Sequence, residues 1–219
     1  MSDVDGQPPT SPVVAPFEQD EHTRNRLIRA AVHVFDRKGY AAASVREIVE
    51  LANITKPALY YHFGNKEGLI LAILEDAARE LGTAMVRATA RQGTTRERLT
   101  GLFDELNALF ARHVPVVRVA HALFHGAAEG APVFDFSVFD RGLLGAIRTI
   151  YEDGLRAGEV RRVDPADAAL AVMGVVGACA AHQMHPEFPP LDQERLHRVL
   201  DIVCDGVLKE RPDQGEDKQ

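Results

Sequence analysis

The sequence predicts an all-α protein of nine helices, in which a small three-helix head precedes a larger helical body. Apolar residues recur at three- and four-residue spacing through most of the chain, as they do on the buried face of a helix. No stretch alternates apolar and polar residues in the way a half-buried strand does. Glycine, proline and helix-capping residues mark the breaks between the periodic segments, so the number of helices can be counted from them.

The head is expected to contain three helices. The first covers residues 21–38, where apolar residues share one face and a glycine follows. The second begins at Ser44, because Ser44 and Glu47 form a capping-box pattern in which each side chain satisfies a free backbone amide. Thr55 caps a short third helix, and Gly64 ends it.

Six further helices form the expected body. Lys66 opens a long helix to residue 91, which joins head and body. Pro115, Pro132 and Gly158 then separate the helices that follow. These five helices are expected over residues 94–114, 116–128, 133–157, 165–183 and 191–208.

Charge is distributed unevenly along the chain. The net charge is −7, yet residues 22–66 hold eight Lys or Arg and three Asp or Glu, which gives this segment +5 and leaves −12 elsewhere. A basic head on an acidic body indicates contact with a polyanion through the head and a separate task for the body.

The third helix carries an aromatic and basic surface, in the stretch "TKPALYYHFGNK". Leu59 and Phe63 are four residues apart and are expected to face inward together. The other faces then hold Thr55, Lys56, Ala58, Tyr60, Tyr61 and His62. Such a surface, at a helix N-terminus with free amides, suits phosphates and base edges in a DNA major groove. A core cluster of aromatics would explain Phe63 and part of Tyr61 only.

These residues match a known family. The stretch "SVREIVELANITKPALYYHFGNKEGLI", with the preceding "RLIRAAVHVFDRKGYAAAS", resembles the DNA-binding domain of the TetR (tetracycline-repressor) transcription regulators over residues 22–70. The resemblance implies a ligand-responsive regulator of transcription, most simply a repressor that a small molecule releases from its operator. We expect the DNA contacts to come from Arg24, Ser44, Val45, Arg46, Thr55, Lys56, Pro57, Ala58, Tyr60, Tyr61, His62 and Lys66.

The resemblance also implies a domain organisation. We expect a disordered arm at 1–20, a helix-turn-helix DNA-binding domain at 21–67, a ligand-binding and dimerisation domain at 68–209 and a disordered tail at 210–219. Reading two half-sites of a near-palindromic operator requires a two-fold dimer. The small residues of 165–183 and the apolar stripe of 191–208 are expected to form that homodimer interface.

The body is rich in Phe and His, which predicts a mostly apolar effector pocket with polar anchors. The expected lining is Phe103, Leu106, Phe110, His113, Val117, His121, Phe124, His125, Ile147, Tyr151 and Met173. His121 and His125 also have the spacing at which two imidazoles share a metal. A metal-responsive regulator, or a metal-dependent enzyme that uses these two and His182, is therefore an alternative. An adaptor for an acidic protein is a third interpretation.

No other chemistry is indicated. The sequence shows no catalytic constellation, phosphate loop or cofactor motif, so we expect neither an enzyme nor a bound cofactor or metal. The N-terminus lacks a signal peptide, and the longest apolar run, residues 168–181, is too short to span a bilayer. Cys179 and Cys204 lie among apolar residues, as in a reducing compartment. These features predict a cytoplasmic protein without a membrane segment.

Overall fold

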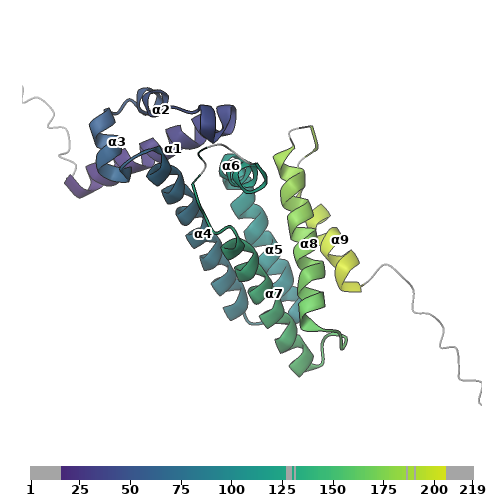
Figure 1. Cartoon of the computed structure of the whole chain (residues 1–219). Coiled ribbons are helices and arrows are strands. Elements are labelled where there is room, and N and C mark those ends of the chain that lie inside the picture. Colours follow the sequence, from purple (N-terminus) through teal and green to yellow (C-terminus); the bar gives the residue numbers. More distant parts are fainter. Residues whose placement is uncertain (1–15, 127–129, 131, 186, 190, 206–219) are drawn as a thin grey trace, which may run out of the picture.

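The computed structural model describes residues 16–126, 130, 132–185, 187–189 and 191–205. Within these residues the chain forms nine α-helices and no strand, which confirms the predicted fold class (Figure 1). The helices are α1 Pro16–Ala42, α2 Val45–Ala52, α3 Lys56–Phe63, α4 Lys66–Ala90, α5 Thr95–Arg112, α6 Val114–His125, α7 Ser137–Ala157, α8 Pro165–Met184 and α9 Gln193–Asp205.

Several helix boundaries differ from the expected ones by a few residues, and two of these differences change an interpretation. Helix α1 begins at Pro16, so the predicted arm of residues 1–20 is too long at its C-terminal end. Helix α6 begins at Val114, and Pro115 lies in its first turn instead of separating two helices. Proline is tolerated there because its missing N–H would have no partner within the helix. Residues 1–15 and the predicted tail lie outside the described residues.

The capping box of α2 forms as the sequence predicts. The Ser44 hydroxyl accepts a hydrogen bond from the Glu47 amide, and the Glu47 carboxylate accepts one from the Ser44 amide at 3.1 Å. Asn53 adopts a left-handed conformation with φ of 50°, which ends α2 and turns the chain toward α3. Asparagine tolerates this conformation better than most residues. These caps fix the short helices of the head at defined angles.

The head core is built from α1, α2, α3 and the first turns of α4. Its largest fully buried side chains are Leu27, Phe35, Ile48, Leu59, Leu69, Ile70 and Leu74. Val119 of α6 also belongs to this core. Beside it, the Arg118 guanidinium donates to both carboxylate oxygens of Asp36 on α1. Helix α6 therefore fastens the head to the body.

The body core lies between α5, α7, α8, α9 and the second half of α4, which run along the long axis of the molecule (Figure 1). Its buried members include Leu81, Leu102, Leu106, Ile147 and Ile150. Helix α4 contributes side chains to both cores, so it is a continuous rod from the head into the body.

Helix α8 has two faces of different exposure. Ala169, Val172 and Val176 are buried against the body core, whereas Leu170 is 58% exposed. Among the described helices, α8 is the one that is long and apolar enough to cross a membrane by length and composition alone. Because one face packs against the body, the apolar composition of α8 is explained in part by the core, and its exposed face remains to be covered.

Candidate nucleic-acid interface and effector crevice

Helix α3 presents two tyrosines to solvent while a leucine holds it to the head. Leu59 is fully buried in the head core, and Phe63 packs partly against that core. On the outside, Tyr60 is 50% exposed and Tyr61 is 79% exposed. The two faces that the spacing of Leu59 and Phe63 predicts are therefore present.

The N-terminus of α3 offers unoccupied polar groups. Thr55 is the N-cap residue, and its exposed side chain makes no capping hydrogen bond. Lys56 is exposed and forms no ion pair with any described residue. Pro57 is exposed and Ala58 is half-buried, so the chain lies close to the surface of the head here. A helix N-terminus with a free hydroxyl and a free ammonium group is a ready site for a phosphate.

Helix α2 adds a second basic position. Its Arg46 side chain is 76% exposed and is held by Glu50, one turn further on, at 2.7 Å. This hydrogen bond raises the pKa of Arg46, so the group stays charged. Ser44, at the start of the helix, is exposed, and Val45 is half-buried. Val45 lies in the first turn of α2, where backbone amides have no partner within the helix, whereas the Ser44 amide is held by Glu47.

Lys66 does not point outward as the sequence analysis expected. Its ammonium group donates to the backbone oxygens of Tyr40 at 2.9 Å and Ala43 at 3.0 Å, and more weakly to that of Ala41. The same group lies 4.4 Å from the centre of the Tyr40 ring. An ammonium group has three donors, and three carbonyl groups occupy them. Lys66 thus closes the end of α1 against α4 instead of reaching a phosphate.

His62 and Arg24 also turn toward the protein. The His62 side chain is only 8% exposed and lies 3.4 Å from a carboxylate oxygen of Asp20. Arg24 pairs with Asp76 of α4 at 3.1 Å, and its guanidinium lies 5.8 Å from the centre of the Phe63 ring. The sequence could not show this, because α1 and α4 supply these partners from outside the motif.

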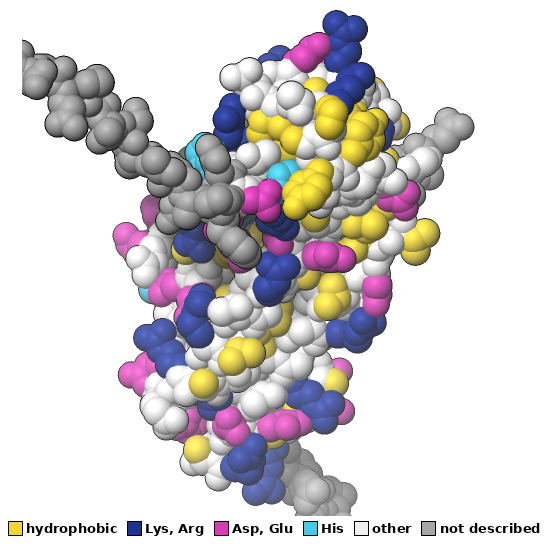
Figure 2. Space-filling model, turned by 90° about the vertical axis from the view of Figure 1, so that its left-hand side faces the viewer, with side chains coloured by type: hydrophobic (Ala, Val, Ile, Leu, Met, Phe, Trp, Pro, Cys, Tyr) yellow, Lys and Arg dark blue, Asp and Glu magenta, His cyan; other side chains and the backbone are white. Residues whose placement is uncertain are grey.

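Figure 2 shows the head from the α3 side, with hydrophobic side chains gathered among Lys and Arg side chains at its upper end. Acidic and basic side chains are mixed over the body below. Positive charge around an apolar, hydroxylated patch is the surface that nucleic-acid recognition requires.

A narrow crevice lies in the body where α5, α8 and α9 meet. Its lining consists of Phe103, Leu106, Asn107, Phe110, Val176, Cys179, Gln183 and Leu196. Its volume is about 10 Å³, which is about the space of one water molecule. The Gln183 side-chain amide donates to Asn107, so the crevice carries one polar pair in an apolar lining.

The crevice brings together three of the predicted pocket residues, Phe103, Leu106 and Phe110. The other lining residues do not follow from the sequence, because their place in the crevice depends on how α8 and α9 cover α5. Asn107 and Gln183 could have been found as polar residues on otherwise apolar helix faces. Burial raises the pKa of the Cys179 thiol, which keeps it protonated.

The remaining predicted pocket residues lie elsewhere. Ile147 is buried in the body core, with Met173 packed partly against it. The Tyr151 hydroxyl donates to the backbone oxygen of Arg161, and His113 lies 3.2 Å from a carboxylate oxygen of Glu80. Val117 is half-buried on α6, and His121, Phe124 and His125 are exposed at the end of that helix.

The rings of the two α6 histidines, His121 and His125, are tilted by 50° to each other, with their centroids 4.3 Å apart. Partial desolvation, with weaker repulsion from His125 and His185, lowers the pKa of His121, so its neutral form is favoured. Within the described residues no group of three or more His, Cys, Asp or Glu is placed to hold a metal ion. The metal-based alternatives therefore gain no support from this histidine pair.

Known proteins resemble both the head and the whole fold. Residues 27–73 match the family model for bacterial regulatory proteins of the tetR family. TtgR of Pseudomonas putida, an HTH-type transcriptional regulator, is 34% identical over 110 residues, which cover 48% of this chain and 51% of TtgR. The chain thus matches about half the length of this relative.

Solved structures extend the likeness to the body. PfmR of Thermus thermophilus, a TetR-family transcriptional regulator, superimposes with a TM-score of 0.70 at 25% identity, over 84% of this chain and all of PfmR. FadR of Bacillus subtilis, solved with stearoyl-CoA, shares the fold with a TM-score of 0.68 at 19% identity, over 84% of this chain and 99% of FadR. By sequence, residues 27–73 thus match the tetR family of bacterial regulatory proteins, and by fold the described helices match a TetR-family transcriptional regulator.

Proposed function

We propose that this chain is a cytoplasmic, homodimeric transcriptional regulator that binds a near-palindromic operator through α3 and is released by a small molecule. The observation that carries the proposal is the exposed surface of Thr55, Lys56, Tyr60 and Tyr61, which Leu59 anchors to the head. The proposed DNA contacts add Arg46 and the start of α2 to these residues. Lys66, His62 and Arg24 are left out, because other partners hold their side chains.

A selection for bound DNA sequences, followed by titration of the selected duplex, tests DNA recognition. We expect Tyr61→Ala and Lys56→Ala each to weaken binding by about tenfold, which corresponds to about 1.4 kcal/mol. Lys56→Ala should also reduce the salt dependence of binding by about one released counterion. Selection of no preferred sequence, or unchanged affinity in both variants, would contradict the proposed interface.

The dimer is proposed to form through α8 and α9. On α8 an exposed stripe of small and apolar residues repeats every three or four positions, at Leu170, Ala171, Gly174, Gly177 and Ala178. A Cβ atom added at Gly174 or Gly177 would meet nothing within 4 Å, so packing inside one chain does not require either glycine. Close approach of a helix from a second chain would require both. On α9, Ile202 is 52% exposed and adds apolar surface.

The effector is proposed to be an apolar or amphipathic molecule that enters between α5, α8 and α9. The crevice is too small to hold it in the present arrangement, so binding favours a state in which these helices are further apart. The Asn107–Gln183 pair would meet a polar group of the effector. FadR has the same fold and was solved with stearoyl-CoA, which is consistent with a bulky apolar effector.

A screen for compounds that release the selected operator identifies the effector. We then expect Phe110→Ala and Gln183→Leu to change the concentration of compound needed for release, while operator affinity without the compound stays the same. An unchanged response in both variants would place the effector elsewhere in the body.

A further inference from the structure

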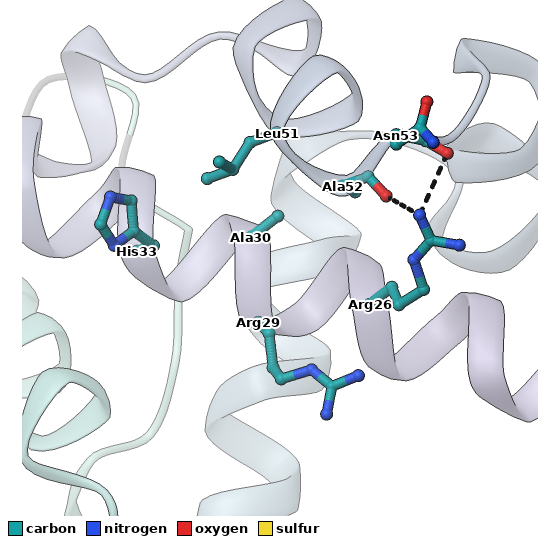
Figure 3. Close-up of a pocket in the computed structure, with 7 residues that line it drawn as sticks. All are labelled: Arg26, Arg29, Ala30, His33, Leu51, Ala52 and Asn53. Atoms are coloured by element: carbon teal, nitrogen blue, oxygen red, sulfur yellow. Dashed lines mark hydrogen bonds between the residues drawn. The ribbon is translucent and has the colours of Figure 1, made fainter.

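The head has a concave surface between α1 and α2, away from α3. The groove has a volume of about 340 Å³ and is lined by Arg26, Arg29, Ala30, His33, Leu51, Ala52 and Asn53 (Figure 3). In Figure 3 the Leu51 side chain points from α2 toward α1, and the basic side chains come from α1.

The groove combines positive charge with apolar surface. Arg29 and His33 are exposed and form no ion pair or hydrogen bond with the described residues. Arg26 donates to the backbone oxygens of Ala52 and Asn53, which fixes its guanidinium at the end of α2. Leu51 is 54% exposed beside them. The structure therefore leaves His33 and Leu51 uncovered in the groove and Arg29 uncovered at its edge, where its side chain extends away from α2 in Figure 3.

Cationic and titratable side chains continue along α1. The residues His22, Arg26, Arg29, His33 and Arg37 repeat every three or four positions and share one face of the helix. Between residues 22 and 40 the single carboxylate of α1 is Asp36, which is paired with Arg118. No acidic side chain on this stretch of α1 therefore cancels the positive electrostatic potential of the arginines on this face.

The groove faces away from the proposed DNA contacts. This statement rests on the proposed function, which gives the surface of the head that meets DNA. Leu51 follows Arg46 by five residues, so the two side chains point about 140° apart around α2. On α1, Arg29 and His33 lie across the helix from Leu27 and Ala31, which pack in the head core with α3. The groove therefore stays open when α3 occupies a major groove.

We propose that this groove is a docking site for a second protein, which inserts an acidic segment that carries one aliphatic side chain. Carboxylates of the segment pair with Arg29 and His33, and the aliphatic side chain covers Leu51 and Ala30. A DNA backbone would match the charge but would leave Leu51 uncovered, because phosphates offer it no apolar surface. An acidic peptide matches both properties of the groove. A regulator bound to its operator can thus hold a partner protein at the same time.

The test uses the full chain bound to its selected operator duplex. The probes are fluorescein-labelled acidic peptides with one leucine, which differ in the spacing between the leucine and two glutamates. In the matched control peptides both glutamates are replaced by glutamine. Fluorescence anisotropy measures their affinity for the wild type, Arg29→Glu, Leu51→Gln and Arg46→Ala.

We expect a peptide with at least one of these spacings to bind. Its glutamine control should bind at least about tenfold more weakly, as a charge-dependent contact requires. Arg29→Glu should weaken peptide binding by about tenfold, which corresponds to about 1.4 kcal/mol. Leu51→Gln should weaken it by about threefold, or about 0.7 kcal/mol. Both variants should keep wild-type operator affinity and melting temperature. Arg46→Ala should weaken operator binding, and without DNA it should bind the peptide as well as the wild type does.

Three outcomes would overturn the docking site. One is that no acidic peptide binds the wild type. The second is equal peptide affinity in Arg29→Glu, Leu51→Gln and the wild type. The third is that Arg29→Glu weakens the operator complex and lowers its salt dependence without affecting any peptide, which would make the groove a DNA surface. Because operator binding is measured separately, failure of the docking site is distinguishable from failure of the proposed DNA recognition.

Discussion

Lys56 begins α3 and Lys66 begins α4, and the surroundings of these two lysines differ. Lys56 is exposed and forms no ion pair with a described residue, whereas three carbonyl groups and the Tyr40 ring surround the Lys66 ammonium group. Hydrogen bonds to a charged donor contribute more to stability than neutral ones do. The two lysines are therefore a matched pair that separates a binding role from a structural role.

We predict that Lys66→Ala lowers the free energy of unfolding by roughly 1–3 kcal/mol, because the carbonyl oxygens at the end of α1 lose their donor. Lys56→Ala should change stability by less than about 0.5 kcal/mol, as exposed substitutions usually do, while weakening operator binding. Urea unfolding measures the first effect and titration of operator DNA the second. If Lys66→Ala weakened DNA binding at unchanged stability, Lys66 would be a phosphate contact after all.

Glu159 is a residue whose contribution depends on pH. Its carboxylate accepts hydrogen bonds from the Thr95 amide at 2.6 Å and from the Thr95 hydroxyl at 2.8 Å, at the start of α5. The amide hydrogen bond, followed by that of the hydroxyl, lowers the pKa of Glu159 below its ordinary value of 4.5. A carboxylate with a lowered folded-state pKa stabilises the protein above its unfolded-state pKa, and this stabilisation is lost as the pH falls through the folded-state value.

We therefore predict that Glu159→Gln melts at a lower temperature than the wild type at neutral pH. The difference should be full above pH 4.5 and should shrink as the pH falls below that value. Thermal melts across this range provide the measurement, with Glu75→Gln on the exposed side of α4 as the control. A difference that does not depend on pH would show that charge is not the cause.

At the scale of elements, α5 and α7 approach closely at one glycine. A Cβ atom added at Gly154 of α7 would lie 2.1 Å from the Thr95 hydroxyl oxygen and 3.1 Å from its Cβ. Thr95 is buried and branched at Cβ, so its side chain has little freedom to move away. Gly145 of the same helix is exposed, and a Cβ atom there would meet nothing within 4 Å.

This pair of glycines gives a test within one helix. Gly154→Ala should destabilise the protein by about 1–3 kcal/mol through overpacking, although alanine is the better helix former. Gly145→Ala should stabilise it by up to about 1 kcal/mol, because only the helix propensity changes. Chemical denaturation of both variants measures the change in the free energy of unfolding, which should be a decrease for Gly154→Ala and an increase for Gly145→Ala. Equal stabilisation by both substitutions would mean that α5 and α7 are further apart at this point.

Features that depend on one helix alone were predicted correctly. Features that depend on neighbouring helices were not. The Ser44–Glu47 capping box and the inward face of Leu59 follow from spacing along one helix, and both are present. The inward turn of Lys66 depends on where the end of α1 lies, and that of His62 on the start of α1. The effector crevice depends on three helices from distant parts of the sequence, so composition identified only its members on α5.

At the scale of the whole molecule, the proposed dimer gives a further prediction. Gly174→Glu places a charged side chain on the exposed face of α8, where one chain alone has room for it. We expect it to shift the protein from dimer to monomer in light-scattering chromatography and to weaken operator binding, because one head contacts a single half-site. Gly145→Glu on α7 is the matched control and should leave the dimer intact. A dimeric Gly174→Glu protein would place the interface elsewhere.

Because α4 contributes to both cores, it limits where the head of one regulator can be joined to the body of another. Its first turns supply Leu69, Ile70 and Leu74 to the head core, and its later turns supply Leu81 and Met85 to the body core. A chimaera that joins this head to another body directly after α3 would leave a hole in the head core. A functional chimaera needs its junction beyond Leu74, and it needs an apolar partner in the place of Val119. The DNA-reading unit that can be transferred is therefore longer than the helix-turn-helix itself.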